Sequence, residues 1–315
     1  MRTTAPRVKK TIPSPTDVGA LANRINFHTR DAHNKINAYM SVRIAFALKH
    51  GFIYRQGVLT FYHIFDAIEQ ELDRLLQDPQ TPEEIQMQNV LRQFWVEEFR
   101  RSHRIFRDLE VLYSPEYPSK DELREFVTNH APAPKLQEFV NFIHESVQRE
   151  PCTILAYCHV MYLALFAGGK VMRSNIYRHT GLFPKFEFLS PRELVLRGTN
   201  LFTFSEEGTD AENKLRWKYK EGYELATRHE LSESQKVRII EVSGQIFDWN
   251  TQVIAEIGTL NRQELMHTFS FKLLTYIAEE WKHSQLLSKR SKDLIIVLAL
   301  LLQFLIVYFI LRKFV

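Results

Sequence analysis

The sequence predicts an all-α protein that consists of one helical domain and a C-terminal transmembrane helix. Apolar residues recur at spacings of three and four over most of the chain, which is the period of an amphipathic helix. Alternating β-branched runs bounded by hairpin turns are nearly absent, so strands are not expected. With 12% aromatic residues and only 11 glycines in 315 residues, the composition is typical of a globular helical protein rather than of repeats or disorder.

Capping residues and apolar stripes locate the first helices. Thr16 or Asp17 is expected to cap a helix that runs to about Tyr39. A second helix is predicted over residues 56–77, and Thr81 then caps a third, which has a proline in its first turn. The apolar stripe of the first helix consists of Leu21, Ile25, Ala32, Ile36 and Met40.

The remainder of the domain is predicted to be helical as well, with prolines and glycines marking its loops. We find no internal repeat and no linker long enough to separate two domains, so residues 16–288 are expected to form one domain. Residues 1–15 carry basic side chains, three prolines and no acid, which predicts a disordered basic arm. Further helices are expected near residues 120–129, 135–148, 151–180, 211–228, 232–260 and 261–288.

Charge and cysteine content exclude some partners and one kind of crosslink. The formal net charge is +4, and basic and acidic residues are mixed along most helices, so a nucleic-acid partner is not expected. Cys152 and Cys158 are six residues apart on one predicted helix and lie on different faces, which argues against a disulfide. A reducing compartment is consistent with this pattern.

An apolar run near the C-terminus predicts a membrane anchor. Residues 294–311 form an 18-residue apolar run that is interrupted only by Gln303, and as a helix they would span about 27 Å, close to the thickness of bilayer hydrocarbon. Only four residues follow, so insertion is expected after synthesis ends, with the folded domain in the cytosol. The basic cluster at residues 289–292 agrees with the positive-inside rule.

The adjacent Gly168 and Gly169 lie inside a predicted helix, where each glycine costs roughly 1 kcal/mol relative to alanine. A chain accepts this cost where the backbone must come close to another group. Tight packing against a neighbouring helix is one explanation, and a flat ligand lying against the helix is the other.

His33 is the histidine with the most distinctive surroundings, since Thr29, Ile36 and Met40 share its mostly apolar helix face. Such a histidine is either a core residue or a ligand, and neutral imidazole is a common ligand of haem iron. Sequence signatures of hydrolases, kinases, dinucleotide binders and zinc sites are missing. A di-metal carboxylate site built on Glu69, Glu71 and His63 is only weakly supported, because the helices lack the Glu-x-x-His motif.

Several segments together resemble the haem oxygenase family, over about residues 20 to 265. They occur in that family's order and spacing, and the C-terminal anchor makes the chain most similar to the fungal, membrane-anchored branch. The segments are Thr29-Arg30-Asp31-Ala32-His33, residues 61–71 (FYHIFDAIEQE), Ala167-Gly168-Gly169, and Phe202-Thr203-Phe204 followed by Arg216, Tyr219 and Lys220.

The resemblance implies a function and a set of site residues. Haem b would be both substrate and cofactor, cleaved to biliverdin, CO and Fe²⁺ with O2 and with electrons from NADPH through a partner reductase of the NADPH-cytochrome P450 reductase type. His33 would be the proximal ligand of the iron, and Gly168 and Gly169 the distal wall of the pocket. Further haem contacts would come from Thr29, Tyr62, Arg216, Tyr219, Lys220 and, more weakly, Arg24.

Two departures from the family pattern affect the expected chemistry. Leu165 stands where the family usually has an aspartate that holds proton-delivering waters, and Asn37 replaces the glutamate that orients the proximal imidazole. Leu165 therefore leaves two alternatives open: a haem carrier or sensor with weak turnover, and a haem protein with peroxidase-like chemistry. A member of the same fold that uses its pocket for another small molecule is a third.

The resemblance also favours a location. The expected site is the cytosolic face of the endoplasmic reticulum membrane, where residues 294–311 would contact lipid. Because Arg312 and Lys313 follow the apolar run, the mitochondrial outer membrane stays an alternative.

Overall fold

The computed structural model describes residues 12–269, 271–272 and 275. The chain divides into a unit over residues 1–259 and a second unit over residues 260–315. Every regular element in the described part is a helix, which confirms the all-α prediction for those residues. The predicted anchor at residues 294–311, and residues 1–11 of the predicted basic arm, lie outside the described residues.

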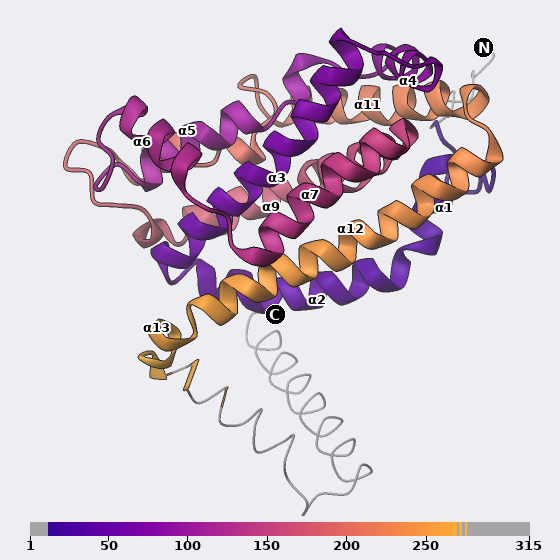
Figure 1. Ribbon diagram of the computed structural model, residues 1–315. Coiled ribbons are helices and arrows are strands. Elements are labelled where there is room, and N and C mark those ends of the chain that lie inside the picture. Colours follow the sequence, from indigo (N-terminus) through magenta and orange to yellow (C-terminus); the bar gives the residue numbers. More distant parts are fainter. Residues whose placement is uncertain (1–11, 270, 273–274, 276–315) are drawn as a thin grey trace, which may run out of the picture. The chain divides into compact units, whose positions relative to one another are not determined.

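The first unit is organised around α3 (Gly51–Gln77), whose apolar stripe is buried from end to end. Figure 1 shows α3 crossing the middle of this unit beside α7 (Pro134–Arg149). Besides α7, α3 packs against α5 (Ser102–Leu112) and α4 (Pro82–Arg92). Its core-facing side chains include Ile64, Phe65, Ile68, Leu72 and Leu75. Because this stripe follows the helical period, its burial is what the sequence pattern dictates.

Most later helices follow the predicted ones closely, with Lys120–Asn129 identical in bounds to the expectation. The helix predicted over residues 261–288 is interrupted in its described part, since α13 ends at Met266 and a turn follows at residues 267–268. Two short helices, α5 and α10, had not been predicted individually, and the described part of the second unit contains α13. The remaining elements are α6 (Lys120–Asn129), α9 (Leu163–Tyr177), α10 (Pro191–Arg197), α11 (Thr209–Glu230), α12 (Glu233–Leu260) and α13 (Arg262–Met266).

The prediction for the first helix is wrong at its start and at its end. The structure divides it into α1 (Leu21–His28) and α2 (Arg30–Ala47), which meet at Thr29. Asp17 caps no helix: Oδ1 accepts from the amide of Gly19 at 3.0 Å, and Oδ2 forms an ion pair of 2.5 Å with Arg228 on α11. Because Gly19 precedes α1, the local hydrogen bond of Asp17 forms a turn before the helix and leaves the helix start at Leu21.

The segment Pro151–Tyr177 is the apolar centre of the domain. It is long and apolar enough to cross a membrane by length and composition, but 67% of its most apolar window is buried inside the protein. Its course is not one regular α-helix: a π turn at Cys158–Tyr162 separates α8 (Ile154–Tyr157) from α9. π turns inside helices are frequent at functional sites.

Candidate haem site

His33 lies on the exposed side of α2. Among the described side chains of this helix none is fully buried, although several are apolar. The imidazole meets the ring of Phe247 on α12 edge to face, with 5.9 Å between the ring centroids. Asn37, one turn further along, places its amide nitrogen 3.3 Å from Nδ1 of His33. The same nitrogen lies 3.5 Å from Nε2, so the amide stands beside both ring nitrogens, and with the amide turned over its oxygen can accept a proton from either of them.

Thr29 acts within the backbone rather than toward a ligand. It is 5% exposed, and its hydroxyl donates to the carbonyl of Ile25 at 2.8 Å. The carbonyl of Thr29 in turn accepts from the amide of His33 at 2.8 Å. The expectation that its side chain contacts haem is therefore replaced by a role in the joint between α1 and α2, which fixes the direction of the helix that carries His33.

The two glycines of α9 have different surroundings. A Cβ added to Gly169 would lie 2.8 Å from the carbonyl oxygen of Phe202, closer than real side chains approach. A Cβ added to Gly168 would have nothing within 4 Å. Packing therefore explains Gly169, and only Gly168 is left for the explanation that a ligand approaches the backbone.

Gly168 belongs to a stripe of small side chains along one face of α9. Ala164 and Ala167 are exposed, Gly168 is half-buried, and Val171 is 60% exposed, so a face with the i, i+3, i+4, i+7 spacing is open. Leu165 lies beside this stripe and packs against the core. Its isobutyl group keeps the neighbouring part of the helix apolar, as expected from the sequence.

Tyr219 and Tyr223 of α11 donate hydrogen bonds to backbone carbonyls in and just before the π turn. Tyr219 is fully buried and donates to the carbonyl of Cys158 at 2.7 Å, while Tyr223 donates to the carbonyl of Leu155 at 3.0 Å. Such donors satisfy buried carbonyls where the regular helix pattern is interrupted. Burial also raises the pKa of Tyr219 well above its usual value. In this structure the hydroxyl of Tyr219 donates its one proton to the carbonyl of Cys158, so that proton is not available to a carboxylate.

Arg216 and Lys220, one turn apart on α11, are placed so that both could bind a carboxylate. Both are half-buried, and neither forms an ion pair with a carboxylate in the described part of the chain. Burial, together with the charge of Arg216, lowers the pKa of Lys220. Two half-buried cations without an anionic partner are suited to binding an anionic ligand.

Arg24 and Tyr62 have protein partners instead. Arg24 forms an ion pair of 2.8 Å with the exposed Glu233 at the start of α12. Tyr62 lies on α3 and faces α5, with 5.9 Å between the centroids of its ring and the ring of Phe106. Burial, together with the charges of nearby carboxylates, raises the pKa of Tyr62 to about 12. These contacts give both residues structural roles in the described state.

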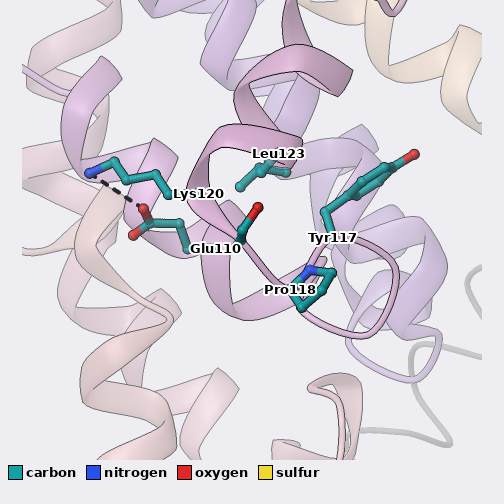
Figure 2. Close-up of a pocket in the computed structure, with 6 residues that line it drawn as sticks. Glu110, Tyr117, Pro118, Lys120 and Leu123 are labelled. Carbon is teal, nitrogen blue, oxygen red and sulfur yellow. Dashed lines mark ion pairs between the residues drawn. The ribbon is translucent and has the colours of Figure 1, made fainter.

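A pocket of about 250 Å³ lies elsewhere, between α5 and α6. Figure 2 shows its lining, with the ion pair of 3.5 Å between Lys120 and Glu110 at its edge. The other lining residues are Tyr117, Pro118, Ser119 and Leu123. None of the predicted haem contacts lines it, so this pocket is separate from the candidate site.

Residues 19–256 match the protein family described as Heme oxygenase. This chain belongs to the heme oxygenase family. It is 57% identical over 305 residues, or 96% of each chain, to the Heme-binding protein HMX1 of Saccharomyces cerevisiae. It is 24% identical to the Heme oxygenase of Rhodella violacea, over 71% of this chain and 80% of that one.

Solved heme oxygenases share the fold. Heme oxygenase-2 from Synechocystis sp. PCC 6803, in complex with heme and NO, superimposes with a TM-score of 0.61 at 22% identity, over 82% of this chain and 92% of that one. The Leptospira interrogans heme oxygenase gives a TM-score of 0.58 at 20% identity, over 75% and 99%. The all-α domain predicted from the sequence is therefore a heme oxygenase fold.

The side chains of this heme oxygenase family member fit the group that gives the family its name. An exposed imidazole on α2 can bind iron, the open small-residue face of α9 can accept a flat ring, and Arg216 with Lys220 can pair with carboxylates. Of the haem contacts predicted from the sequence, these three are available to a ligand in the described part of the structure. Thr29, Tyr62, Arg24 and Tyr219 have other partners in the structure.

Sequence reasoning missed Arg173 and Glu212, which fasten α9 to α11. They form a bidentate ion pair with N–O distances of 2.7 and 2.6 Å, and both are mostly buried. Arg173 also donates to the hydroxyl of Thr203 at 3.2 Å, and Glu212 accepts from the amide of Phe204 at 2.9 Å. Their spacing from Gly169 and Arg216, one turn in each case, was the available signal.

Asp108 holds the same loop from the other side and makes stability depend on pH. Its carboxylate accepts from the amides of Asn200 and Leu201, both at 2.7 Å. Burial, opposed by these hydrogen bonds, raises the pKa of Asp108 from 3.8 to about 7. Since the folded pKa lies above the unfolded one, this group stabilises the fold below about pH 4 and loses that contribution as the pH rises through about 7.

We expect Asp108→Asn to destabilise the fold by about 1–3 kcal/mol at pH 5, because its amide group leaves a buried N–H donor unpaired. The cost is expected to shrink as the pH rises to 8, because the wild type then buries a charge that the variant lacks. Urea unfolding in mild detergent at both pH values measures the difference. A cost that stays constant over this range would contradict the assignment.

Proposed function

We propose that this protein binds haem between α2 and α9 and cleaves it to biliverdin, CO and Fe²⁺, in the service of haem turnover and iron recovery. Membership of the heme oxygenase family supports the reaction class. The observation that supports His33 as the iron ligand is its exposed imidazole on α2, a helix of which no described side chain is fully buried. A relative named as a heme-binding protein agrees with the ligand.

Each remaining site residue has a definable task in this proposal. His33 binds the iron through Nε2, while Asn37 accepts the Nδ1 proton and sets the orientation of the ring. Arg216 and Lys220 pair with the two propionates and so fix the rotation of the ring in its plane. Gly168 lets the backbone of α9 lie against the ring face. Bound haem supplies the iron that activates O2 and the carbon that is oxidised.

Leu165 controls the proton supply in this proposal. An aspartate at this position would hold water on the distal side, whereas a leucine that packs against the core excludes it. Proton delivery to the distal side then depends on less ordered water, and turnover is expected to be slow. A second candidate function, a haem carrier or sensor that retains haem with little cleavage, rests on the same leucine.

We further propose that electrons come from an NADPH-cytochrome P450 reductase-type partner and that residues 294–311 anchor the chain in the endoplasmic reticulum membrane, facing the cytosol. The apolar run and its basic flanks in the sequence support the anchor. The mitochondrial outer membrane is the alternative location. Expression of the full chain with a fluorescent N-terminal tag distinguishes the two membranes.

An aerobic turnover assay tests the main proposal. The purified full chain is loaded with haem, reduced without oxygen by the reductase and NADPH, and then exposed to air. Loss of the Soret band with formation of biliverdin supports the oxygenase, whereas a persistent haem spectrum supports the carrier. A chain that binds no haem at all would favour a different small-molecule ligand for this fold.

Leu165→Asp is expected to raise the rate of biliverdin formation by at least about tenfold, since a positioned acid speeds proton transfer. Leu165→Asn is the matched control, because it adds polarity without an acid and should gain much less. Equal rates in the two variants would show that proton supply does not limit turnover. Circular dichroism of both variants checks that the substitution leaves the helix folded.

A further inference from the structure

His159 occupies the π turn at Cys158–Tyr162 and is 4% exposed. Its Nε2 lies 3.1 Å from Oδ1 of Asn26 on α1. The ring also packs against Tyr223, with 5.6 Å between the ring centroids. A buried imidazole in the irregular turn of one helix is therefore hydrogen-bonded to a different helix, 133 residues earlier in the chain.

The partner occupies one nitrogen of this imidazole. The side-chain amide of Asn26 pairs with Nε2 of His159 in either orientation, by accepting its proton or by donating to its lone pair, and the tautomer follows from that orientation. Nδ1 is buried and has no hydrogen-bond partner in the described part of the chain. Burial and the charge of Lys220 lower the pKa of His159 to about 3, so the ring is neutral. Burying an unpaired nitrogen costs free energy, so an apolar side chain would serve better if packing were its only task.

The hydrogen bond joins the two segments that directly precede α2 and α9, the helices between which haem is proposed to bind. Asn26 lies on α1, three residues before the joint at Thr29, and the buried hydrogen bond of Thr29 fixes the angle at which α2 continues to His33. His159 lies five residues before Ala164, where the open face of α9 begins. A shift of α1 relative to the π turn would therefore move His33 relative to α9.

We infer that His159 is a positioning residue, which holds α1 against the π turn before α9 through Asn26 and so sets the separation of α2 and α9, the two helices that enclose haem. This inference rests on the proposed haem binding for its functional consequence. The hydrogen bond between His159 and Asn26, called the latch below, is a property of the chain without haem and can be tested there.

Three variants separate the latch from general packing. His159→Phe fills the same space and removes Nε2, Asn26→Ala removes the partner of Nε2, and His159→Gln keeps an amide group that can pair with Asn26 in either direction. Two quantities are measured on the full chain: amide hydrogen exchange of residues 21–47 without haem, and the rate at which bound haem is released to apomyoglobin.

We expect exchange over residues 21–47 to accelerate by about threefold to tenfold in His159→Phe and in Asn26→Ala, the range that loss of one hydrogen bond produces. His159→Gln and the amides of α3 should stay within about twofold of the wild type. The double variant His159→Phe/Asn26→Ala should show no more than the larger single effect, because both changes remove one interaction.

Haem release should follow the same order, with the melting temperature of haem-free His159→Phe equal to or above that of the wild type. Unchanged exchange over residues 21–47 overturns the latch whether or not haem binds. Faster exchange with unchanged haem release supports the latch but overturns its role at the site. Failure of the wild type to bind haem contradicts the proposed function alone, since the exchange data still decide the latch.

Discussion

His33→Ala is expected to abolish the absorption spectrum of ligated haem and to raise the dissociation constant for haem by at least about 100-fold, since even outer partners of a metal ligand are worth 10- to 100-fold. The physical reason is that the substitution removes the nitrogen that binds iron while leaving the exposed side of α2 otherwise intact. Titration of the purified variant with ferric haem, followed in the Soret region, measures both quantities.

His28→Ala supplies the control for this prediction. His28 is also exposed, lies five residues earlier on α1, and its ring meets the ring of Phe27 edge to face, with 5.4 Å between the centroids. It should bind haem like the wild type. Added imidazole should restore a ligated spectrum to His33→Ala, because the free ligand can occupy the space of the lost ring. A wild-type spectrum in His33→Ala would refute the assignment of the iron ligand.

The parts of the fold that the sequence predicted well are those that local signals determine. The helix at Lys120–Asn129 has the expected bounds because Ser119 and Glu122 form a reciprocal capping box at its start. The helix after Thr81 begins in the same way, with Glu84 as the partner. In both cases the residues that set the start of the helix lie within four positions of one another, so the start can be predicted without knowledge of tertiary contacts.

Features that depend on distant partners could not be predicted in this way. The break at Thr29 divides one apolar stripe into two helices, and Asp17 pairs with Arg228 instead of capping a helix. Tyr219 has the right type and position for a carboxylate contact, but the π turn takes its hydroxyl. Motif matching places Thr29 and Tyr219 in the candidate site but carries no information about their hydrogen bonds, which run to backbone carbonyls.

The glycine pair allows a test in which adjacent positions respond in opposite directions. Gly169→Ala is expected to destabilise the fold by about 1–3 kcal/mol, because its Cβ would overlap the carbonyl oxygen of Phe202 and force the loop away from α9. Gly168→Ala is expected to stabilise the haem-free chain by up to about 1 kcal/mol, because alanine favours the helix and nothing lies near its Cβ. Urea unfolding in mild detergent measures both.

Haem affinity should also distinguish the two variants, and here the more stable variant, Gly168→Ala, should be the one that binds haem more weakly. The methyl group of Gly168→Ala would stand on the open face of α9 and hold a flat ring away from the backbone, so haem binding should weaken although the fold is more stable. The Cβ of Gly169→Ala would point toward Phe202 and not to the open face, so haem bound to the folded fraction of this variant should keep the wild-type spectrum. If Gly168→Ala bound haem as tightly as the wild type, the ring would not lie against this face, and the stripe around Gly168 would lose its assigned role.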